Sequence, residues 1–291
     1  MHKKQILIEF GSNTAKVFSL SKIKPLGKTE VYPLRLADGL DSQDRLASPV
    51  MDEMIRLIDN TKTEHPHAKI HLIATQALRS ARNQAEIIDR LRDTTGLSLQ
   101  ILSPQDEARA AFMGIMAVSR IQGDMLSFDI GGASTEIIFG KNGKLKQWKS
   151  FPIGAVNLTM DSPADPSFES QINRLITKDA IAEIMLSNIG SFRLVGCGGS
   201  VNTALSIALA HHSQSYSEDS GHELYLAEIT RQIELMRPLS AGEIAAIAGM
   251  DPTRADIMLA ALCIIRHIMD ISHKESFTIS GGGVRQGYFL L

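Results

Sequence analysis

Cysteine is scarce in this chain, which has only Cys197 and Cys263 among its 291 residues. Both lie in apolar stretches, which is typical of buried free thiols. Two such residues are too few for a disulfide framework and make a thiolate metal site a poor explanation. The chain also lacks low-complexity and linker-like segments.

A strong net charge and a long hydrophobic run are missing as well. The formal net charge is −2, with 21% charged and 44% hydrophobic residues, so there is no long-range attraction for nucleic acid or an anionic membrane. The apolar part of MHKKQILIEF at the N-terminus is too short for a signal peptide or a membrane span. We therefore expect a cytoplasmic protein without nucleic-acid or membrane partners, which holds any anionic ligand by local groups; a homodimer is left open.

Two short segments share one design, IEFGSNT at 8–14 and FDIGGASTE at 128–136. In each, an apolar strand leads into an acid, a glycine and small polar residues, and a second apolar strand follows. Glycine lets a ligand approach the backbone N–H groups, hydroxyl side chains add donors, and the carboxylate can hold a cation. One copy is weak support, because such turns also form for conformational reasons. Two copies indicate phosphate and metal binding at a cleft between duplicated lobes.

Length and periodicity predict two α/β lobes, residues 1–123 and 124–291, which part near Gly123-Asp124. In the first lobe we expect strands at 5–9, 14–19, 70–74 and 97–102, and helices at 49–60, 84–94 and from Pro104 onward, with Ser103 as N-cap. In the second we expect strands at 125–130, 134–140, 192–196 and 276–279, a turn at 141–144 that leads into another strand, and helices around 168–186, after 198–200 and at 257–269. The short terminal helix is a candidate to pack back on the first lobe.

A third glycine-rich turn, residues 196–203, lies between a strand and a helix. Helix N-termini bind anions through free N–H groups and the helix dipole. Glycine also serves such turns when no ligand is present, so this turn fits phosphate binding and a purely conformational role about equally well.

Seven strings extend the pattern along the chain, at residues 8–14, 74–83, 102–109, 129–136, 151–159, 196–203 and 280–287. They occur in the order found in the exopolyphosphatase / guanosine pentaphosphate phosphatase family, which the chain resembles over nearly its whole length. That family's fold is similar to actin, Hsp70 and sugar kinases, with two ribonuclease-H-like lobes and an interlobe cleft. We expect the form without the C-terminal helical domain of longer members.

The resemblance implies an activity and its chemistry. The expected reaction is hydrolysis of the terminal phosphoanhydride of inorganic polyphosphate or guanosine pentaphosphate, with Mg²⁺ as the expected divalent cation. Glu107 matches the catalytic glutamate, which would orient and deprotonate the attacking water. Asp129, Glu136 and, in the first hairpin, Glu9 are the expected metal-site acids.

Phosphate binding is implied for a larger set. Arg79 matches an arginine that would bind phosphate bidentately. The remaining expected donors belong to the three glycine-rich turns: Gly11, Ser12, Asn13, Thr14, Gly131, Gly132, Ser134, Thr135, Gly198, Gly199 and Ser200.

Plainer alternatives exist for the charged residues. Glu107 also fits an acid in a first helical turn, Arg79 a surface helix cap, and Asp129 and Glu136 a turn cap and a solvent-facing strand residue. His65 and His67 flank Pro66 in a polar loop, and a solvated loop explains them better than a metal pair.

Three residues depart from the family pattern: Glu9, where the family has aspartate, Asp106 and Ala133. A longer acid near the chemistry changes positioning, and Ala133 would be strained if its φ were positive. These departures motivate a rival reading, a non-catalytic nucleotide or alarmone sensor of the same fold. A kinase-like phosphotransferase is a second rival.

Overall fold

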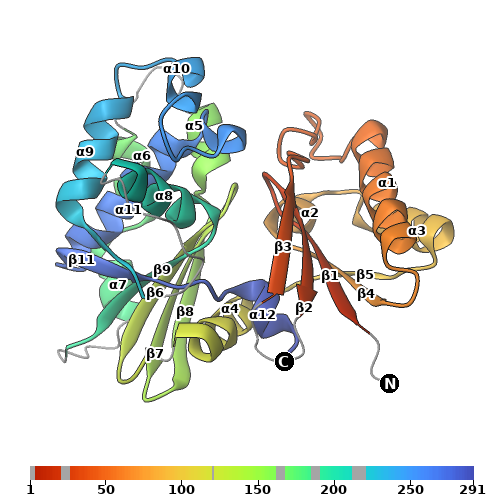
Figure 1. Cartoon of the computed structure of the whole chain (residues 1–291), viewed down its shortest axis with the longest axis horizontal. Helices are drawn as coiled ribbons and strands as arrows, with labels where there is room; N and C mark the ends of the chain where they lie inside the picture. The colour runs from red at the N-terminus through yellow and green to blue at the C-terminus, as the bar shows by residue number, and fades with distance from the viewer. Residues whose placement is uncertain (1–3, 21–26, 120, 162–167, 185–190, 212–220) are drawn as a thin grey trace. The chain divides into compact units, whose positions relative to one another are not determined.

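The computed structural model describes residues 4–20, 27–119, 121–161, 168–184, 191–211 and 221–291 (Figure 1). By its contacts the chain divides into two compact units, Met1–Ala110 and Ala111–Leu291. The division runs through helix α4 (Pro104–Ser119), earlier than the boundary expected near residue 123. The second half of α4 belongs to the second unit, where Phe112 packs on Gly140 and Gly114 on the backbone of Gly283.

The first unit is built on a five-stranded sheet of order β3-β2-β1-β4-β5. Its strands are β1 (Gln5–Phe10), β2 (Ala15–Leu20), β3 (Gly27–Tyr32), β4 (Lys69–Ala74) and β5 (Leu99–Ile101). The first three form an antiparallel meander, and β4 and β5 continue the sheet in parallel with β1. The helices besides the first half of α4 are α1 (Ser48–Glu64), α2 (Gln76–Ser80) and α3 (Gln84–Thr95).

Helix α1 forms where it does because its apolar residues recur at helical spacing. Met51, Met54 and Ile58 are buried on one side of α1 and pack in the same core as Ile8 and Phe10 of β1. A stripe of this kind is what anchors a helix on a sheet.

The second unit is built on a six-stranded sheet of order β10-β11-β9-β6-β7-β8. Its strands are β6 (Met125–Ile130), β7 (Thr135–Lys141), β8 (Lys144–Phe151), β9 (Arg193–Cys197), β10 (Glu223–Tyr225) and β11 (Ser276–Ile279). Its helices are α5 (Ala155–Asp161), α6 (Glu169–Leu175), α7 (Lys178–Ile184), α8 (Gly199–His211), α9 (Leu226–Met236), α10 (Ala241–Ala245), the 3₁₀ helix η1 (Pro252–Arg254), α11 (Met258–Ile271) and α12 (Val284–Tyr288).

Helix α11 is apolar almost all round, and it is correspondingly buried between α5, α6, α8 and α9. Among the residues that the structure describes, no helix has both the length and the apolar character needed to cross a membrane.

The two sheets repeat one topology. In each, three consecutive strands form an antiparallel meander, and two further strands extend the sheet in parallel with the first of the three. The second sheet adds β10, antiparallel to β11, at its edge. The predicted fold class, two ribonuclease-H-like α/β lobes, is confirmed at the level of each unit.

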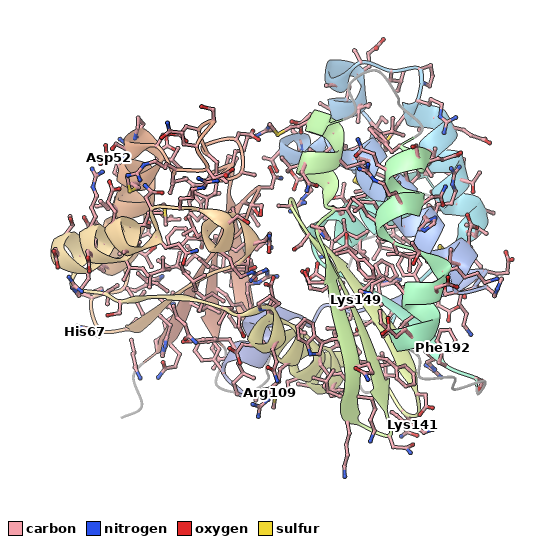
Figure 2. All side chains as sticks on the ribbon, turned by 180° about the vertical axis from the view of Figure 1, so that it is seen from behind. Asp52, His67, Arg109, Lys141, Lys149 and Phe192 are labelled. Atoms are coloured by element: carbon pink, nitrogen blue, oxygen red, sulfur yellow. The ribbon has the colours of Figure 1, made fainter. Side chains whose placement is uncertain are left out.

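Several local predictions are also confirmed. The strands at 125–130 and 276–279 have the expected bounds. Asn142 and Gly143 have φ values of 50° and 71°, as a two-residue hairpin turn requires, and Lys141 marks this end of the hairpin in Figure 2. Ser103 Oγ accepts from the N–H of Asp106 at 3.1 Å and so caps α4.

The prediction of a single helix around 168–186 is wrong. The described part contains α6 and α7, separated at Ile176, whose φ of −109° and ψ of 84° leave the helical region. Thr177 then starts a new helix, because its Oγ1 accepts from the N–H of Ala180 at 3.2 Å. Residues 185 and 186 lie outside the described residues. Contacts place α12 in the second unit.

Gly196 of β9 offers a test of the second core. A Cβ there would come within 2.9 Å of the rings of Phe277 and Phe128, which pack edge to face with centroids 5.2 Å apart. We expect Gly196→Ala to lower the free energy of unfolding by about 1–3 kcal/mol through overpacking, measured by urea denaturation. Gly242→Ala is the matched control, since nothing lies within 4 Å of a Cβ at that helical site, and it should be neutral or slightly stabilising. Equal stability of the two variants would contradict the packing argument.

Candidate active site

Both hairpin loops have the same turn. The N–H of Gly11 donates to the carbonyl of Thr14 at 3.0 Å, and the N–H of Gly131 donates to the carbonyl of Ser134 at 2.9 Å. The strand pairs that flank them, β1 with β2 and β6 with β7, are in the same register around the turn. The sequence similarity of the two segments therefore reflects one repeated backbone structure.

The carbonyl side of the first loop is tied to the chain that follows β3. The N–H groups of Ala37 and Arg35 donate to the carbonyls of Ser12 and Asn13 at 2.9 and 2.8 Å. A peptide carbonyl and the N–H of the same unit point in opposite directions. These bonds therefore fix the direction in which the loop presents its N–H groups.

The second loop is tied in the same way to the start of α5, after β8. The N–H of Ala155 donates to the carbonyl of Gly131 at 2.9 Å. The carbonyl of Gly132 accepts from the N–H groups of Val156 at 2.8 Å and Asn157 at 3.1 Å.

Close packing supports this second contact. A Cβ on Gly154 would overlap the backbone of Gly132 and Ala133, so only glycine allows the approach. The Asn157 side chain accepts from the N–H of Gly154 at 2.7 Å and donates to the carbonyl of Ala133 at 3.2 Å. Ala133 does not have a positive φ, so its replacement of glycine introduces no backbone strain.

The N–H side of each loop carries donors without partners. Within the described ranges, no hydrogen bond engages the N–H groups of residues 12–14 or 132–134. The side-chain Nδ2 of Asn13 also has no partner there, although Asn13 is only 6% exposed. Orphaned donors at a buried turn are what an anion-binding loop requires. The predicted phosphate donors of the two hairpins are therefore brought together within each loop.

The acids of the two hairpins occupy corresponding positions but face different partners. Glu9 lies directly across from Lys16, with Oε2 and Nζ 3.9 Å apart. Asp129 lies directly across from Glu136, whose Oε1 accepts from Ser150 Oγ at 2.7 Å. The first carboxylate thus faces an ammonium group, whereas the second faces another carboxylate.

Two adjacent carboxylates provide hard oxygen ligands, so Asp129 and Glu136 fit a cation such as Mg²⁺, which often uses one or two carboxylates plus phosphates. Lys16 weighs against Glu9 as a metal ligand, and that role stays a prediction. No group of three or more histidine, cysteine or acidic side chains arranged for a metal occurs among the described residues. His67 is exposed in the loop between α1 and β4 (Figure 2), as its solvated reading predicts.

Glu107 is 7% exposed at the start of α4, and its carboxylate bonds to Arg79. Arg79 Nη1 donates to Glu107 Oε2 and to the carbonyl of Leu102, both at 2.8 Å. The Nε and Nη2 groups of Arg79 donate to Gln76 Oε1 at 3.1 and 2.6 Å. Arg109, two residues beyond Glu107, is exposed (Figure 2). Arg79 is thus a partner of the predicted catalytic acid, and its phosphate role stays a prediction.

The third turn is occupied by side chains of the protein. Gly198 has a φ of 96°, and a Cβ there would overlap the carboxylate of Asp129; a Cβ on Gly199 would overlap the guanidinium of Arg254. Ser200 is buried. The phosphate role of this turn stays a prediction, while its glycines provide the space for two charged groups.

Cys197, beside Asp129 on the neighbouring strand, is buried, as is Cys263. Burial, with Asp129 adding to the effect, raises the pKa of the Cys197 thiol well above its usual value. Sequence reasoning missed Arg254, whose signal is an arginine after Asp251-Pro252 at the edge of an apolar helix. It also missed Arg35 and Ala37, which contribute only backbone N–H groups.

A model of the Ppx/GppA phosphatase family matches residues 17–290. The chain belongs to this family. The match begins within β2, after the first glycine loop, and takes in Arg79, Glu107, the second glycine loop and the third turn.

Relatives of known name are similar along nearly the whole chain. Proteins named guanosine-5'-triphosphate,3'-diphosphate pyrophosphatase from Aeromonas salmonicida and Vibrio atlanticus are 26% and 28% identical over 96% of this chain and 57% of their own length. The chain therefore spans a little over half the length of the curated relatives it matches.

Solved structures give the same fold. An exopolyphosphatase from Cytophaga hutchinsonii is similar with a TM-score of 0.84 at 23% identity, over 99% of this chain and 97% of that one. A Ppx/GppA family member from Aquifex aeolicus is similar with a TM-score of 0.77 at 25% identity, over 99% and 96%.

The Arg79–Glu107 pair gives a stability test. Its side chains are only 17% and 9% exposed, so Arg79→Met leaves a largely buried carboxylate without its cation and should cost about 2–4 kcal/mol in urea denaturation. The double variant Arg79→Met/Glu107→Gln should cost less than Arg79→Met alone, since no uncompensated charge remains.

A matched control is the exposed pair Arg45–Glu86, with side chains 46% and 49% exposed. Arg45→Met should cost less than about 1 kcal/mol. If the double variant proves less stable than Arg79→Met, charge pairing is not what Arg79 contributes.

Proposed function

We propose that this protein hydrolyses the terminal phosphoanhydride of a linear polyphosphorylated substrate. The observation that carries the proposal is the pair of hairpin loops, each with its carbonyls bonded on one side and orphaned N–H groups on the other. Repeated anion-binding turns suit a substrate with several phosphate groups. Family membership over residues 17–290 supports the same reaction class.

Glu107 is the proposed general base. A base of this kind accepts the proton of the attacking water while the carboxylate orients that water in line with the bond that breaks. Arg79 holds Oε2 of Glu107 at 2.8 Å and is itself held by Gln76 and Leu102. The role of Arg79 is therefore to keep the carboxylate in one orientation, because small displacements of a reacting group cost rate.

Each loop would stabilise negative charge on a phosphate group that it binds. In each loop, the N–H donors of residues 12–14 or of residues 132–134 would bind phosphate oxygens, with the amide of Asn13 adding a donor in the first loop, and the Asp129–Glu136 pair would hold a divalent cation. A bound Mg²⁺ would neutralise phosphate oxygens and so favour departure of the leaving group. Phosphoryl transfer needs little beyond such positioning and electrostatics.

Two substrates are proposed, inorganic polyphosphate first and guanosine pentaphosphate second. The similar proteins include relatives named guanosine-5'-triphosphate,3'-diphosphate pyrophosphatase and exopolyphosphatase. The loops would recognise phosphate groups, which both compounds contain. Release of inorganic phosphate from each substrate, with and without Mg²⁺, decides between them. Binding of either substrate by a folded protein without any release would instead support the non-catalytic sensor.

Glu107→Gln tests the base. The amide keeps the shape of the side chain but cannot accept the proton, so turnover should fall by about 10²–10⁴-fold while substrate binding persists. Asp106→Asn is the matched control, because Asp106 lies on the same helical turn and bonds to the cap residue Ser103 at 2.7 Å. A Glu107→Gln variant that releases phosphate as fast as the parent would remove Glu107 from the mechanism.

Asn13→Leu tests the first loop. Its Nδ2 has no partner within the described residues, so replacing the amide by an apolar group of similar size should leave the melting temperature unchanged or raise it. Loss of a hydrogen bond to a charged phosphate should raise KM by about 10–100-fold. A lower melting temperature with an unchanged KM would show that Asn13 serves the fold and not the substrate.

A further inference from the structure

Two opposite charges lie over neighbouring residues of the third glycine-rich turn. The carboxylate of Asp129 packs on Gly198, and the guanidinium of Arg254 packs on Gly199, both closely enough that a Cβ would overlap them. Consecutive Cα atoms are about 3.8 Å apart. Arg254 is therefore a fixed neighbour of an acid that we place in the cation site.

Arg254 is held there by its own segment. It is 7% exposed and ends η1, the 3₁₀ helix that Asp251 caps by accepting from Thr253 N–H at 3.0 Å and Thr253 Oγ1 at 2.7 Å. The other carboxylate oxygen of Asp251 lies 3.4 Å from Arg254 Nε. One oxygen of Asp251 thus caps the 3₁₀ helix that carries Arg254, and the other lies beside the guanidinium.

Keeping a guanidinium at this position has an energetic cost. Burial lowers the pKa of Arg254, and the carboxylates of Asp251 and Asp129 act in the opposite direction. Arg285 also faces this region and lowers the pKa of Arg254 further. Asp251 and Asp129 are the carboxylates that offset this cost.

The consequence concerns the charge that a cation meets. Asp129 lies directly across from Glu136, and two adjacent carboxylates would attract a free divalent ion strongly. A fixed positive charge beside Asp129 repels the same ion, and this repulsion falls only with the inverse of distance. The site is therefore less negative than its two acids suggest.

We propose that Arg254 is a built-in competitor of the divalent cation at the Asp129–Glu136 pair. It keeps binding of the free ion weak, so that the ion binds together with the phosphate oxygens of the substrate, whose negative charge offsets the arginine. Arg254 is then a positioning residue that acts through Asp129. This inference rests on the proposed function, because it assumes the cation site at these acids.

The test measures binding of free Mn²⁺ to the intact chain without substrate, by electron paramagnetic resonance. Arg254→Met should lower the Kd for Mn²⁺ by about tenfold or more, and Arg254→Lys, which keeps the charge, should stay within about threefold of the parent. Damage to the structure would change the Kd in the opposite direction, since it would weaken Mn²⁺ binding. Unchanged or weaker Mn²⁺ binding by folded Arg254→Met overturns the proposal.

Gly199→Ala tests the packing of the Arg254 guanidinium on Gly199 without removing its charge. The three atoms nearest to a Cβ at Gly199 all belong to the Arg254 guanidinium, so this variant displaces the head group and should tighten Mn²⁺ binding less than Arg254→Met does. It also keeps the proposal testable if Arg254→Met fails to fold. An unchanged Kd for Mn²⁺ in Gly199→Ala would contradict the role of the contact between Gly199 and Arg254.

Two controls match these variants. Gly242→Ala adds a methyl group where nothing lies within 4 Å, and Arg231→Met removes an arginine that pairs with Glu228 at 2.7 Å in α9. Neither should change the Kd for Mn²⁺. Asp129→Asn should abolish Mn²⁺ binding in the parent and in Arg254→Met; persistence of binding would place the ion elsewhere and overturn the inference.

The readout separates this inference from the proposed function. Mn²⁺ binding requires no turnover, so tighter binding by Arg254→Met in a protein that releases no phosphate would support the inference and reject the hydrolase. Phosphate release with no change in Mn²⁺ binding would do the reverse.

Discussion

The backbone hydrogen bonds that tie each hairpin loop to the returning chain are the constraint on which the candidate site in each unit depends. In each unit, the segment after the third strand of the meander turns back and donates N–H groups to two loop carbonyls, from Arg35 and Ala37 in one case and from the start of α5 in the other. A carbonyl held in this way fixes the opposite direction of the loop N–H groups. The donors are therefore positioned by backbone hydrogen bonds. Ala133 can replace glycine in the second loop because these bonds involve no side chain at that position.

The repeated frame carries different electrostatics in its two copies. The acid of the first hairpin faces Lys16, whereas the acid of the second faces Glu136 and packs on a glycine beside Arg254. A frame that needs only backbone bonds leaves the side chains at corresponding positions free to diverge. The proposed anion-binding turn of the first hairpin thus has an internal cation, whereas the proposed turn of the second has two carboxylates that fit a metal ion.

Sequence patterns predicted the repeated elements because those elements depend on local periodicity. The two hairpins, the cap at Ser103 and the buried helix near the C-terminus follow from alternation, capping chemistry and apolar spacing. The missed features depend on partners far apart in the chain. Arg79 and Glu107 meet because α2 follows β4 and α4 follows the neighbouring β5, and no spacing rule relates residues on separate segments. The position of Arg254 was missed for the same reason, since its guanidinium packs on Gly199 of a distant strand-to-helix turn. The helix expected around 168–186 failed for a local reason, because Thr177 caps a new helix where the apolar pattern alone continues.

The departures from the family pattern can be weighed by where they lie. Asp106 bonds to the hydroxyl of Ser103 at 2.7 Å and so belongs to the helix cap. Glu9 lies across from Lys16, and its longer side chain places a carboxylate oxygen 3.9 Å from that ammonium group. Ala133 has no positive φ and keeps its carbonyl bonded to Asn157. Asp106 and Ala133 therefore serve the helix cap and the loop backbone, and Glu9 changes the charge balance of the first hairpin.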